Sequence, residues 1–556
     1  MRFSPLFSPP RSKALAAALA LLPWFVLQWV LFRPYYLVND DILKVLMAKG
    51  FGSGGVHSDL FEGSNALLGI FFERLYAWAP HAPWFGWSLY GLQALALTGL
   101  FWAEVSRPRP KERAVLFLLA LVCVYSLFFL FLQFNIVSIL SVQSGVWLLL
   151  SSFETRERAP KTGMIFLALV LFGAAFLLRP QALWLGLFLA APLFIPSWGG
   201  TPRPKERSLY LRWLVPFAFL VAAGQTFHAI HLSRSPEWKA FWAFHREADG
   251  LNEYRSARYD DATRAAFEKA GWSANDLWLF KNWYWMDPVK FSTENLKLLN
   301  ERFPRWGLGA KYGAYSSWGD LLSSHWDLRI LLWALGLSLF CGRGRIRPLL
   351  SLWGTVFLAL AVLLYWLKAT DRVTLPVLVF LVSAAVHFAE FPAKGGVKAW
   401  GWRHRLGALF MIGLAFLSVR ELLDFRVQNL QRRSVEARFD ESLKGMESLG
   451  DRLIVLWDFP LEAVNAFDDL ERFRPFHLFL MSSSQRSPAQ AGLLKEYGLE
   501  DFGKGLVDNP RVLLNCSPEE GVHLAVYLQE RYGLKVRAVK AYDGGYFKVF
   551  SLRSVR

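Results

Sequence analysis

The stretch YYLVNDDILKVLMAKG, residues 35–50, contains two adjacent acids, Asp40 and Asp41, shortly after the nineteen uncharged residues 14–32. A carboxylate at the mouth of a membrane cavity can draw a proton from an acceptor hydroxyl group or orient it, as glycosyl transfer requires. The structural alternative is that the acids stabilise the start of a helix by ~0.3–1 kcal/mol each, with Lys44 as an ion-pair partner. Ionisable groups at membrane depth are costly and tend to be functional, which favours the chemical interpretation.

Cations that can hold a lipid phosphate stand at the ends of other apolar runs. Arg179 lies in FLLRPQALW, and Lys368 and Arg372 lie in WLKATDRVTLPVL. The guanidinium group binds phosphate oxygens in a bidentate manner. The alternatives are that these side chains extend to the membrane interface, or that Arg372 pairs with Asp371.

Further polar side chains in the segments 33–83 and 232–327 are candidates for binding substrate. His57 and Asp59 follow in a glycine-rich loop, where they either contact sugar hydroxyls or form a local pair. A metal held by Asp40, Asp41, His57 and Asp59 has little support, because a hard cation needs several oxygen ligands in fixed geometry. We therefore expect no resident metal or other cofactor.

The segment 232–327 is polar but dense in aromatic residues. Its residues His245, Arg246, Arg255 and Arg258, followed by Asp260-Asp261, form either a solvated helix with local ion pairs or a cover over the acceptor site. SAND (273–276) and STEN (292–295) predict helix starts. The segment is expected to form short helices that lie on the membrane with their aromatic side chains toward the interface.

The composition is that of a polytopic membrane protein. The chain has 556 residues, of which 54% are hydrophobic and 19% charged, with a mean hydropathy of +0.26. Its apolar residues gather in runs close to the ~20 that span a bilayer. Eleven spans are predicted, at 14–32, 84–103, 114–131, 136–152, 162–178, 182–197, 212–231, 328–342, 348–367, 373–389 and 406–420.

The basic residues predict the orientation of these spans. Lys and Arg concentrate in alternate loops, at 107–113, 156–161, 203–212, 343–347 and 394–405, so most of the net charge of +17 reports topology and not nucleic-acid binding. The N-terminus is then cytoplasmic. Residues 33–83, 232–327 and the tail from 421 are expected on the outer face.

The tail, residues 421–556, has the composition of a soluble domain. Apolar runs at 452–459 and 511–516 predict strands, 461–473 and 519–533 predict helices, and 535–553 predicts a hairpin that turns at Asp543-Gly544-Gly545. Alternating strands and helices indicate a small extracytoplasmic α/β domain beside the transmembrane part, residues 1–420.

The beginning of the chain resembles the GT-C superfamily of membrane glycosyltransferases. The shared features are a span followed by an outer loop that opens with an acidic pair, then a glycine turn, a histidine and an Asn-led helix; Asn65, Leu75-Tyr76 and Pro83-Trp84 match this pattern. The resemblance covers about the first 100 residues well and the remaining topology loosely. It implies a GT-C-like fold and a polyprenyl-phosphate-linked sugar donor, with Asp40 or Asp41 as the general base.

The sequence thus predicts an inverting glycosyltransferase in a bacterial cytoplasmic membrane. It would move a sugar to a glycan, lipid or protein acceptor, with Arg179, Lys368 and Arg372 on the donor phosphate. Substrate contacts are expected from His57, Asp59, Asn65, His245 and Arg255. The alternatives are a transporter or flippase of lipid-linked glycans, which would carry charges in mid-membrane, and a polysaccharide ligase or polymerase, which would use residues of the loop 232–327.

Overall fold

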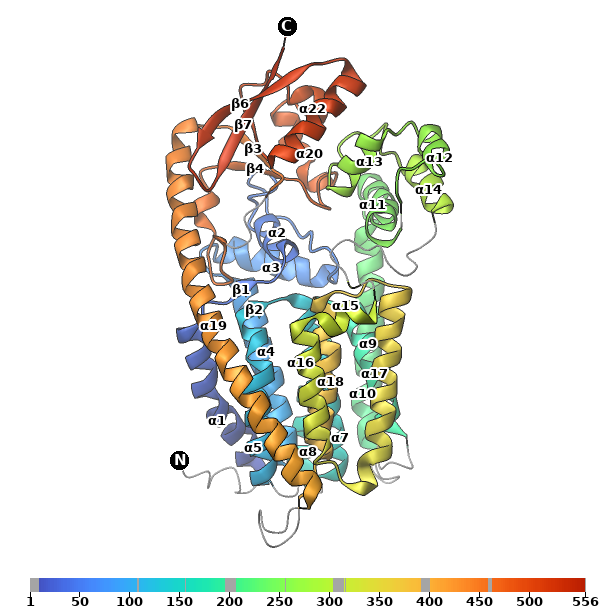
Figure 1. Cartoon of the computed structure of the whole chain (residues 1–556), viewed down its shortest axis with the longest axis vertical. Coiled ribbons are helices and arrows are strands. Elements are labelled where there is room, and N and C mark those ends of the chain that lie inside the picture. Colours follow the sequence, from blue (N-terminus) through green and yellow to red (C-terminus); the bar gives the residue numbers. More distant parts are fainter. Residues whose placement is uncertain are drawn as a thin grey trace.

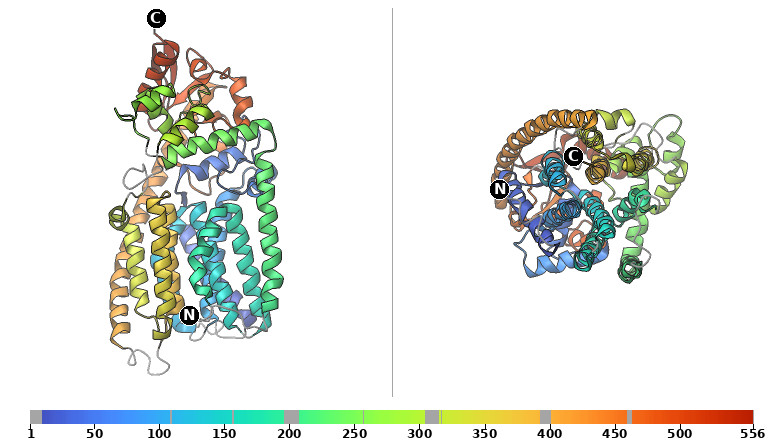
Figure 2. Two further views of the ribbon diagram at one scale, coloured as in Figure 1. Left: turned by 90° about the vertical axis from the view of Figure 1, so that its right-hand side faces the viewer. Right: turned by 90° about the horizontal axis from the view of Figure 1, so that it is seen from below.

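Seven helices in the described residues are long and apolar enough to cross a membrane, and they form the lower part of the molecule (Figures 1 and 2). The computed structural model describes residues 10–107, 110–155, 157–195, 207–255, 257–303, 315, 317–391, 401–458 and 463–555. The basic loop residues at 108–109, 156, 196–206 and 392–400 lie outside these ranges. The seven helices are α1 (Pro10–Leu31), α7 (Phe134–Glu154), α8 (Arg158–Leu178), α10 (Arg207–Leu232), α17 (Ile346–Tyr365), α18 (Asp371–Phe388) and α19 (Trp402–Met446).

The predicted count of eleven spans is not confirmed. The remaining four runs are helical but do not meet the length and hydropathy of a span: α4 (Trp84–Val105), α5 (Pro110–Ala120) with α6 (Leu127–Leu130), α9 (Pro180–Ala190), and α16 (His325–Ser338). The run 114–131 is interrupted by a π-helical turn, Leu121–Tyr125, and α9 passes into a 3₁₀ turn, Ala191–Phe194. In α4, the Trp, Tyr, Gly and Gln residues reduce the mean hydropathy. All four pack within the bundle (Figure 1).

The first outer segment begins with β1 (Tyr35–Tyr36), which pairs in parallel with β2 (Phe131–Leu132). The acidic helix α2 (Asn39–Ala48) follows, and then α3 (Ala66–Trp78). Asn39 is the first residue of α2, and the N-cap is Val38, which makes no side-chain capping bond. Gly50 has a φ of +83°, a conformation that favours glycine, and turns the chain after the helix.

The C-terminal part contains a five-stranded sheet of order β4-β3-β5-β7-β6. Strands β3 (Leu453–Leu456), β4 (His477–Leu480) and β5 (Val512–Asn515) are parallel, while the hairpin β6 (Val536–Asp543) and β7 (Lys548–Ser554) joins β5 in antiparallel fashion. Helices α20 (Pro488–Glu496), α21 (Phe502–Gly505) and α22 (Pro518–Tyr532) connect them. The predicted helix at 461–473 is wrong for its described part, 463–473, which is irregular apart from a short 3₁₀ turn, Glu471–Phe473.

The sheet is enclosed between the two outer segments. Alternate strand residues face opposite ways, so Ile454 and Leu456 pack into one apolar core with Ile42 and Leu46 of α2. The other face, which includes Leu453, Val455 and Phe479, packs into a second core with the segment that follows α10.

That segment forms short helices as predicted: α11 (Pro236–Tyr254), α12 (Arg264–Lys269), α13 (Ala274–Lys281), α14 (Thr293–Arg302) and α15 (Trp318–Ser323). Ser273 and Ser292 cap α13 and α14, which confirms both predicted helix starts. The predicted orientation of the aromatic side chains is wrong, because Trp272, Phe280 and Trp285 are buried in the core against the sheet instead of facing a membrane.

A single helix connects the bundle to the sheet. α19 has 45 residues and rises along the bundle to the C-terminal part (Figure 1), so the predicted boundary at 421 lies within it. It is attached to the first outer segment beside β1: Arg33 Nη1 lies 2.9 Å from Glu436 Oε2, and the Asn429 side-chain amide donates to the Arg33 carbonyl over 2.7 Å.

Charged side chains, most of them buried, also join the opposite ends of the bundle helices. This inner charged cluster consists of Glu104, Arg107, Arg113, Glu154 and His387. Glu104 accepts from Arg113 Nη1 at 3.0 Å and pairs with His387 Nδ1 at 2.7 Å, while Arg107 holds both oxygens of Glu154 at 2.9 and 3.0 Å. Arg107 and Arg113, which the sequence marks as loop charges, are therefore buried between helices.

Candidate functional site

The predicted acids and cations meet where the first outer segment lies above the bundle. This outer charged cluster contains Asp40, Asp41 and Lys44 of α2, Glu62, Arg179, His245, Asp249 and Glu253 of α11, Lys368 and Arg372. Its members come from four separate parts of the chain. The sequence predicted Asp40, Asp41, Arg179, His245, Lys368 and Arg372 as site residues, and the structure brings these six together.

Asp40 and Arg372 form the direct link between the predicted base and the predicted phosphate ligands. Arg372 Nη1 donates to Asp40 Oδ2 over 2.8 Å, and the two side chains are 25% and 51% exposed, respectively. Asp371, the alternative partner, instead accepts from the Arg372 backbone N–H at 2.8 Å, at the start of α18. The accessible carboxylate of the acidic pair is therefore Asp40, next to a guanidinium group.

Asp41 and Lys44 form a buried pair below Asp40. Both side chains lie out of solvent, Lys44 with its ammonium group 3.1 Å from the centre of the Phe134 ring. Within the described part of the chain, neither Asp41 oxygen and no Lys44 proton makes a hydrogen bond of standard geometry. Lys44 lies opposite the apolar residues of α2 in sequence pattern, but the residues around Phe134 cover that side of the helix as well.

Burial shifts the pKa of each member of this pair toward its neutral form. Burial raises the pKa of Asp41 from 3.8 to about 7, although the nearby Lys44 and Arg372 favour the charged carboxylate. Burial lowers the pKa of Lys44 from 10.5 to about 8, against the attraction of Asp41 and Asp40. Strongly shifted groups beside an accessible carboxylate are typical of functional sites.

The other two predicted phosphate ligands, Arg179 and Lys368, also belong to the cluster. Arg179, at the C-terminal end of α8, donates from Nη1 to the Gly63 carbonyl over 3.1 Å, and its guanidinium carbon is 5.7 Å from the Phe134 ring centre. Lys368 forms an ion pair with Glu253. The charges of Arg372, Glu62 and Asp40 lie close enough to Arg179 to affect the pKa of its guanidinium group. Arg179 and Arg372 therefore border the same part of the cluster.

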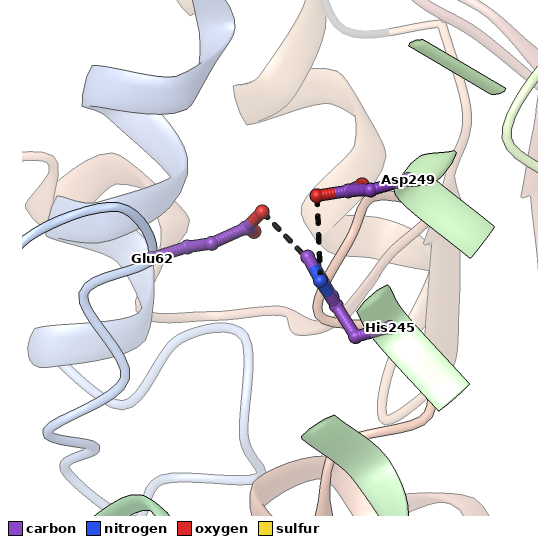
Figure 3. A group of neighbouring side chains, drawn as sticks. All are labelled: Glu62, His245 and Asp249. Carbon is purple, nitrogen blue, oxygen red and sulfur yellow. Dashed lines mark ion pairs between the residues drawn. The ribbon is translucent and has the colours of Figure 1, made fainter. Parts of the chain in front are cut away.

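A histidine between two carboxylates completes the cluster (Figure 3). His245 Nε2 lies 2.9 Å from Glu62 Oε1, and its Nδ1 lies 3.5 Å from Asp249 Oδ2. Burial lowers the pKa of His245, but the Glu62 carboxylate offsets this and the pKa rises to about 9. Burial raises the pKa of Asp249, while His245 holds the pKa of Glu62 below its ordinary value.

This triad also has the donor set of a metal site. One oxygen or nitrogen from each of Glu62, His245 and Asp249 lies within 4.8 Å of the others. A metal would need the imidazole in its neutral form, so it would compete with the proton that the two carboxylates stabilise. The sequence missed Glu62 and Asp249; the only local signal was the i, i+4 spacing of His245 and Asp249 on one helix face.

Four predicted substrate-binding residues make other contacts. His57 Nδ1 lies 2.6 Å from the Ala48 carbonyl at the end of α2, and Arg255 Nη1 donates to the Phe303 carbonyl over 2.7 Å. Asn65 caps α3 through its contact with the Leu67 N–H and donates to the Gly224 carbonyl over 3.3 Å. Asp59 does not pair with His57; it binds His231 and Arg234 beside a neighbouring cavity.

The C-terminal part holds the first outer segment over the bundle. Ser483, which follows β4, donates to Glu62, and Gln490 of α20 donates to the Gly52 carbonyl over 3.0 Å. Lys49 forms an ion pair with Glu471 at 3.1 Å. These contacts position α2 and Glu62.

No protein-family model, curated protein or solved structure matches this chain. The assignment of a function therefore depends on the geometry and chemistry of the outer charged cluster.

Proposed function

We propose that the protein is a membrane glycosyltransferase that moves a sugar from a polyprenyl-phosphate-linked donor to an acceptor hydroxyl. The observation that carries this proposal is the contact of Asp40 with Arg372, with Arg179 and Lys368 close by at the outer ends of apolar helices. A general base, cations for a phosphate and lipid-facing helices are the parts that such a transfer needs.

The Asp40–Arg372 contact supports a specific order of events. A donor phosphate beside Arg372 and Arg179 would compete with Asp40 for the guanidinium group. The Asp40 carboxylate is then free to accept the proton of the acceptor hydroxyl as that oxygen attacks the anomeric carbon. The bond between this carbon and the phosphate oxygen breaks, and the phosphate leaves with its charge held by the two arginines. Attack opposite the leaving group inverts the anomeric configuration.

Asp41 and Lys44 serve a positioning role in this scheme. They lie beneath Asp40 without access to solvent and anchor the first turns of α2 against Phe134. Glu62, His245 and Asp249 border the same space and supply donors and acceptors for sugar hydroxyls. No step in the scheme requires a metal.

The membrane arrangement belongs to the same proposal. The four apolar runs that fall short of a span in length, continuity or hydropathy would complete eleven membrane-crossing segments in a GT-C-like fold, with the N-terminus in the cytoplasm. The outer charged cluster and the C-terminal part, residues 421–556, would then face outward from a bacterial cytoplasmic membrane. The basic loops of the opposite end support this orientation.

A polysaccharide ligase is the second candidate, because His245 and Asp249 of the segment 232–327 reach the cluster. It would use the same donor chemistry with a lipid-linked glycan as acceptor. Transport has less support, since the inner charged cluster lies at helix ends and its groups are paired.

The decisive experiment is transfer by the purified full chain from defined polyprenyl-phosphate hexoses, scored by release of polyprenyl phosphate. Asp40→Asn is expected to reduce turnover by about 10²–10⁴-fold. Asp261→Asn is the matched control, because Asp261 also belongs to an Asp-Asp pair but is 95% exposed and pairs with Arg264, outside the cluster. Equal turnover by Asp40→Asn and the control would disprove the role of Asp40.

A further inference from the structure

A second polar space lies directly beside the outer charged cluster. It is a cavity of about 140 Å³ where the outer end of α10 meets the start of α11. Its lining includes Asp59, Ser64, Gln181, Arg234, Trp238 and Trp242. Four of these carry hydrogen-bonding groups without an aromatic ring, and two are indoles.

The cavity shares a wall with the cluster. Gly63 and Pro180 line it, while the Gly63 carbonyl accepts the hydrogen bond from Arg179 of the cluster. Trp242 lines it from α11, and its ring centre is 5.3 Å from that of His245. A ligand in the cavity would therefore lie next to the residues to which we assign transfer.

The charges in the cavity are balanced. Asp59 Oδ1 accepts from Arg234 Nη2 at 3.0 Å, and Asp59 Oδ2 lies 2.5 Å from His231 Nε2. The Arg234 guanidinium carbon also stacks 4.2 Å from the Trp238 ring centre. An anion such as phosphate would meet the Asp59 carboxylate at close range, so the lining favours a neutral ligand.

Two buried polar atoms of the lining residues lack a partner within the described residues: Trp242 Nε1 and Ser64 Oγ. An indole N–H can only donate, so it requires an acceptor oxygen. Leaving such groups buried and unpaired is costly, and a bound ligand with several hydroxyl groups would satisfy either one that a side-chain rotation turns into the cavity.

From these observations we propose that the cavity binds a hexopyranose ring. Indole faces pack against the C–H face of the ring, while Asp59, Arg234, Gln181, Ser64 and the Trp242 N–H match its hydroxyl groups. The proposal deepens the proposed function, on which it rests, by adding a sugar subsite next to the transfer residues. The sugar can belong to the donor or to the acceptor.

Saturation-transfer NMR of the detergent-solubilised full chain with methyl hexopyranosides tests the proposal without turnover. At least one glycoside is expected to receive magnetisation. Trp242→Phe, which retains a ring and removes the N–H, should weaken its binding about five- to tenfold, and Ser64→Ala should weaken it to a smaller extent. Trp402→Phe is the control, at a tryptophan that is 73% exposed at the start of α19.

The outcomes separate this inference from the proposed function. Binding in Asp40→Asn without turnover supports both proposals, and binding without any turnover in the wild type supports the sugar subsite alone. Turnover without glycoside binding, or equal binding by Trp242→Phe and the control, overturns the subsite. The subsite is also overturned if inorganic phosphate displaces the glycoside and Arg372→Ala leaves this displacement unchanged.

The source of the sugar can be read from a competition. Polyprenyl-phosphate hexose that displaces the glycoside, where polyprenyl phosphate alone does not, assigns the subsite to the donor sugar. Glycoside binding that persists beside the bound donor assigns it to the acceptor. Both results retain the hexopyranose site.

Discussion

The inner and outer charged clusters contain the same kinds of side chain, yet their polar atoms are satisfied very differently. In the inner cluster, Glu104 and Glu154 each have partners on both oxygens, and Arg113 also donates to the carbonyls of His387 and Ala389 at 2.9 Å. In the outer cluster, the buried Asp41 and Lys44 have no hydrogen-bond partner of standard geometry within the described residues. In the same cluster, Arg372 binds the solvent-accessible carboxylate of Asp40.

This difference is the one expected between a structural connection and a binding site. Buried charges that hold one another through good hydrogen bonds fix the helices that carry them. Buried charges without partners cost stability, and they persist where a ligand or a reaction uses them. The comparison predicts that substitutions in the inner cluster affect mainly folding, and that substitutions of Asp40 and Arg372 in the outer cluster affect mainly chemistry.

The largest effect on stability is expected from Glu104→Ala. The change leaves Arg113 and His387 buried without their common partner, which should cost about 3–5 kcal/mol. Chemical unfolding in detergent measures the loss, with the exposed Glu294→Ala at the start of α14 as the control. Transfer per folded molecule should stay near the wild-type value. A loss no greater than that of the control would contradict the structural role of the inner cluster.

Asp41→Asn should increase the free energy of unfolding above neutral pH, whereas Glu104→Ala should reduce it. The raised pKa of Asp41 means that the folded state holds its proton more tightly than the unfolded state. The resulting stability is fully present below about pH 3.8 and is lost as the pH rises through about 7. The variant has no carboxyl group at this position and does not lose this stability. At pH 8 its free energy of unfolding should therefore match or exceed that of the wild type, by up to about 4 kcal/mol.

The gain from Asp41→Asn will be below this limit, because Lys44 loses an attractive neighbour. The measurement is unfolding of both proteins from about pH 4 to about pH 8, with the difference between them plotted against pH. A difference that does not change over this range would contradict the buried, shifted state of Asp41.

Arg372→Lys should weaken use of the donor while leaving the fold intact. Lysine keeps the charge but loses the planar group that binds two oxygens, at a cost of about 1.5–3 kcal/mol for a hydrogen bond to a charged group. This corresponds to a rise in KM for the donor of about 10- to 100-fold. Arg264→Lys, at an exposed arginine, is the control. An unchanged KM would remove Arg372 from the donor site.

The smallest effect is expected from Asn65→Ala. Because Asn65 caps α3, its loss should cost about 0.5–2 kcal/mol of stability. Transfer per folded molecule should remain near the wild-type value, as measured with the same donor. A selective loss of transfer with unchanged stability would restore Asn65 as a substrate-binding residue.

Much of this site was accessible from local signals in the sequence. The acids Asp40 and Asp41 come shortly after an apolar run. Arg179, Lys368 and Arg372 stand out because the predicted outer ends of the spans carry few other basic residues. Strands β3 and β5 and the hairpin at Asp543-Gly544-Gly545 were predicted from apolar runs and turn residues, whereas β4 was missed. Short-range patterns determine these features, so one sequence contains them.

The remaining parts depend on contacts between distant segments. Glu62 has no local pattern, and it becomes a site residue only because α11 carries His245 and Asp249 to it. The helical pattern of α2 places Lys44 on a polar face, but that pattern contains no information about Phe134. The aromatic residues of 232–327 fit a membrane interface as well as a protein core. Only the packed sheet decides between these environments.

The length of α19 sets the position of the whole upper part of the molecule. At 1.5 Å per residue, its 45 residues extend about 68 Å, more than twice the ~30 Å hydrocarbon layer of a bilayer. A continuous helix transmits rotation as well as height, since each added residue turns the rest of the helix by about 100°. One residue inserted between the bundle and Asn429 would therefore swing the sheet away from α2 and separate Ser483 from Glu62. The length of α19 therefore fixes the position of the C-terminal sheet, with Ser483, relative to α2 and Glu62.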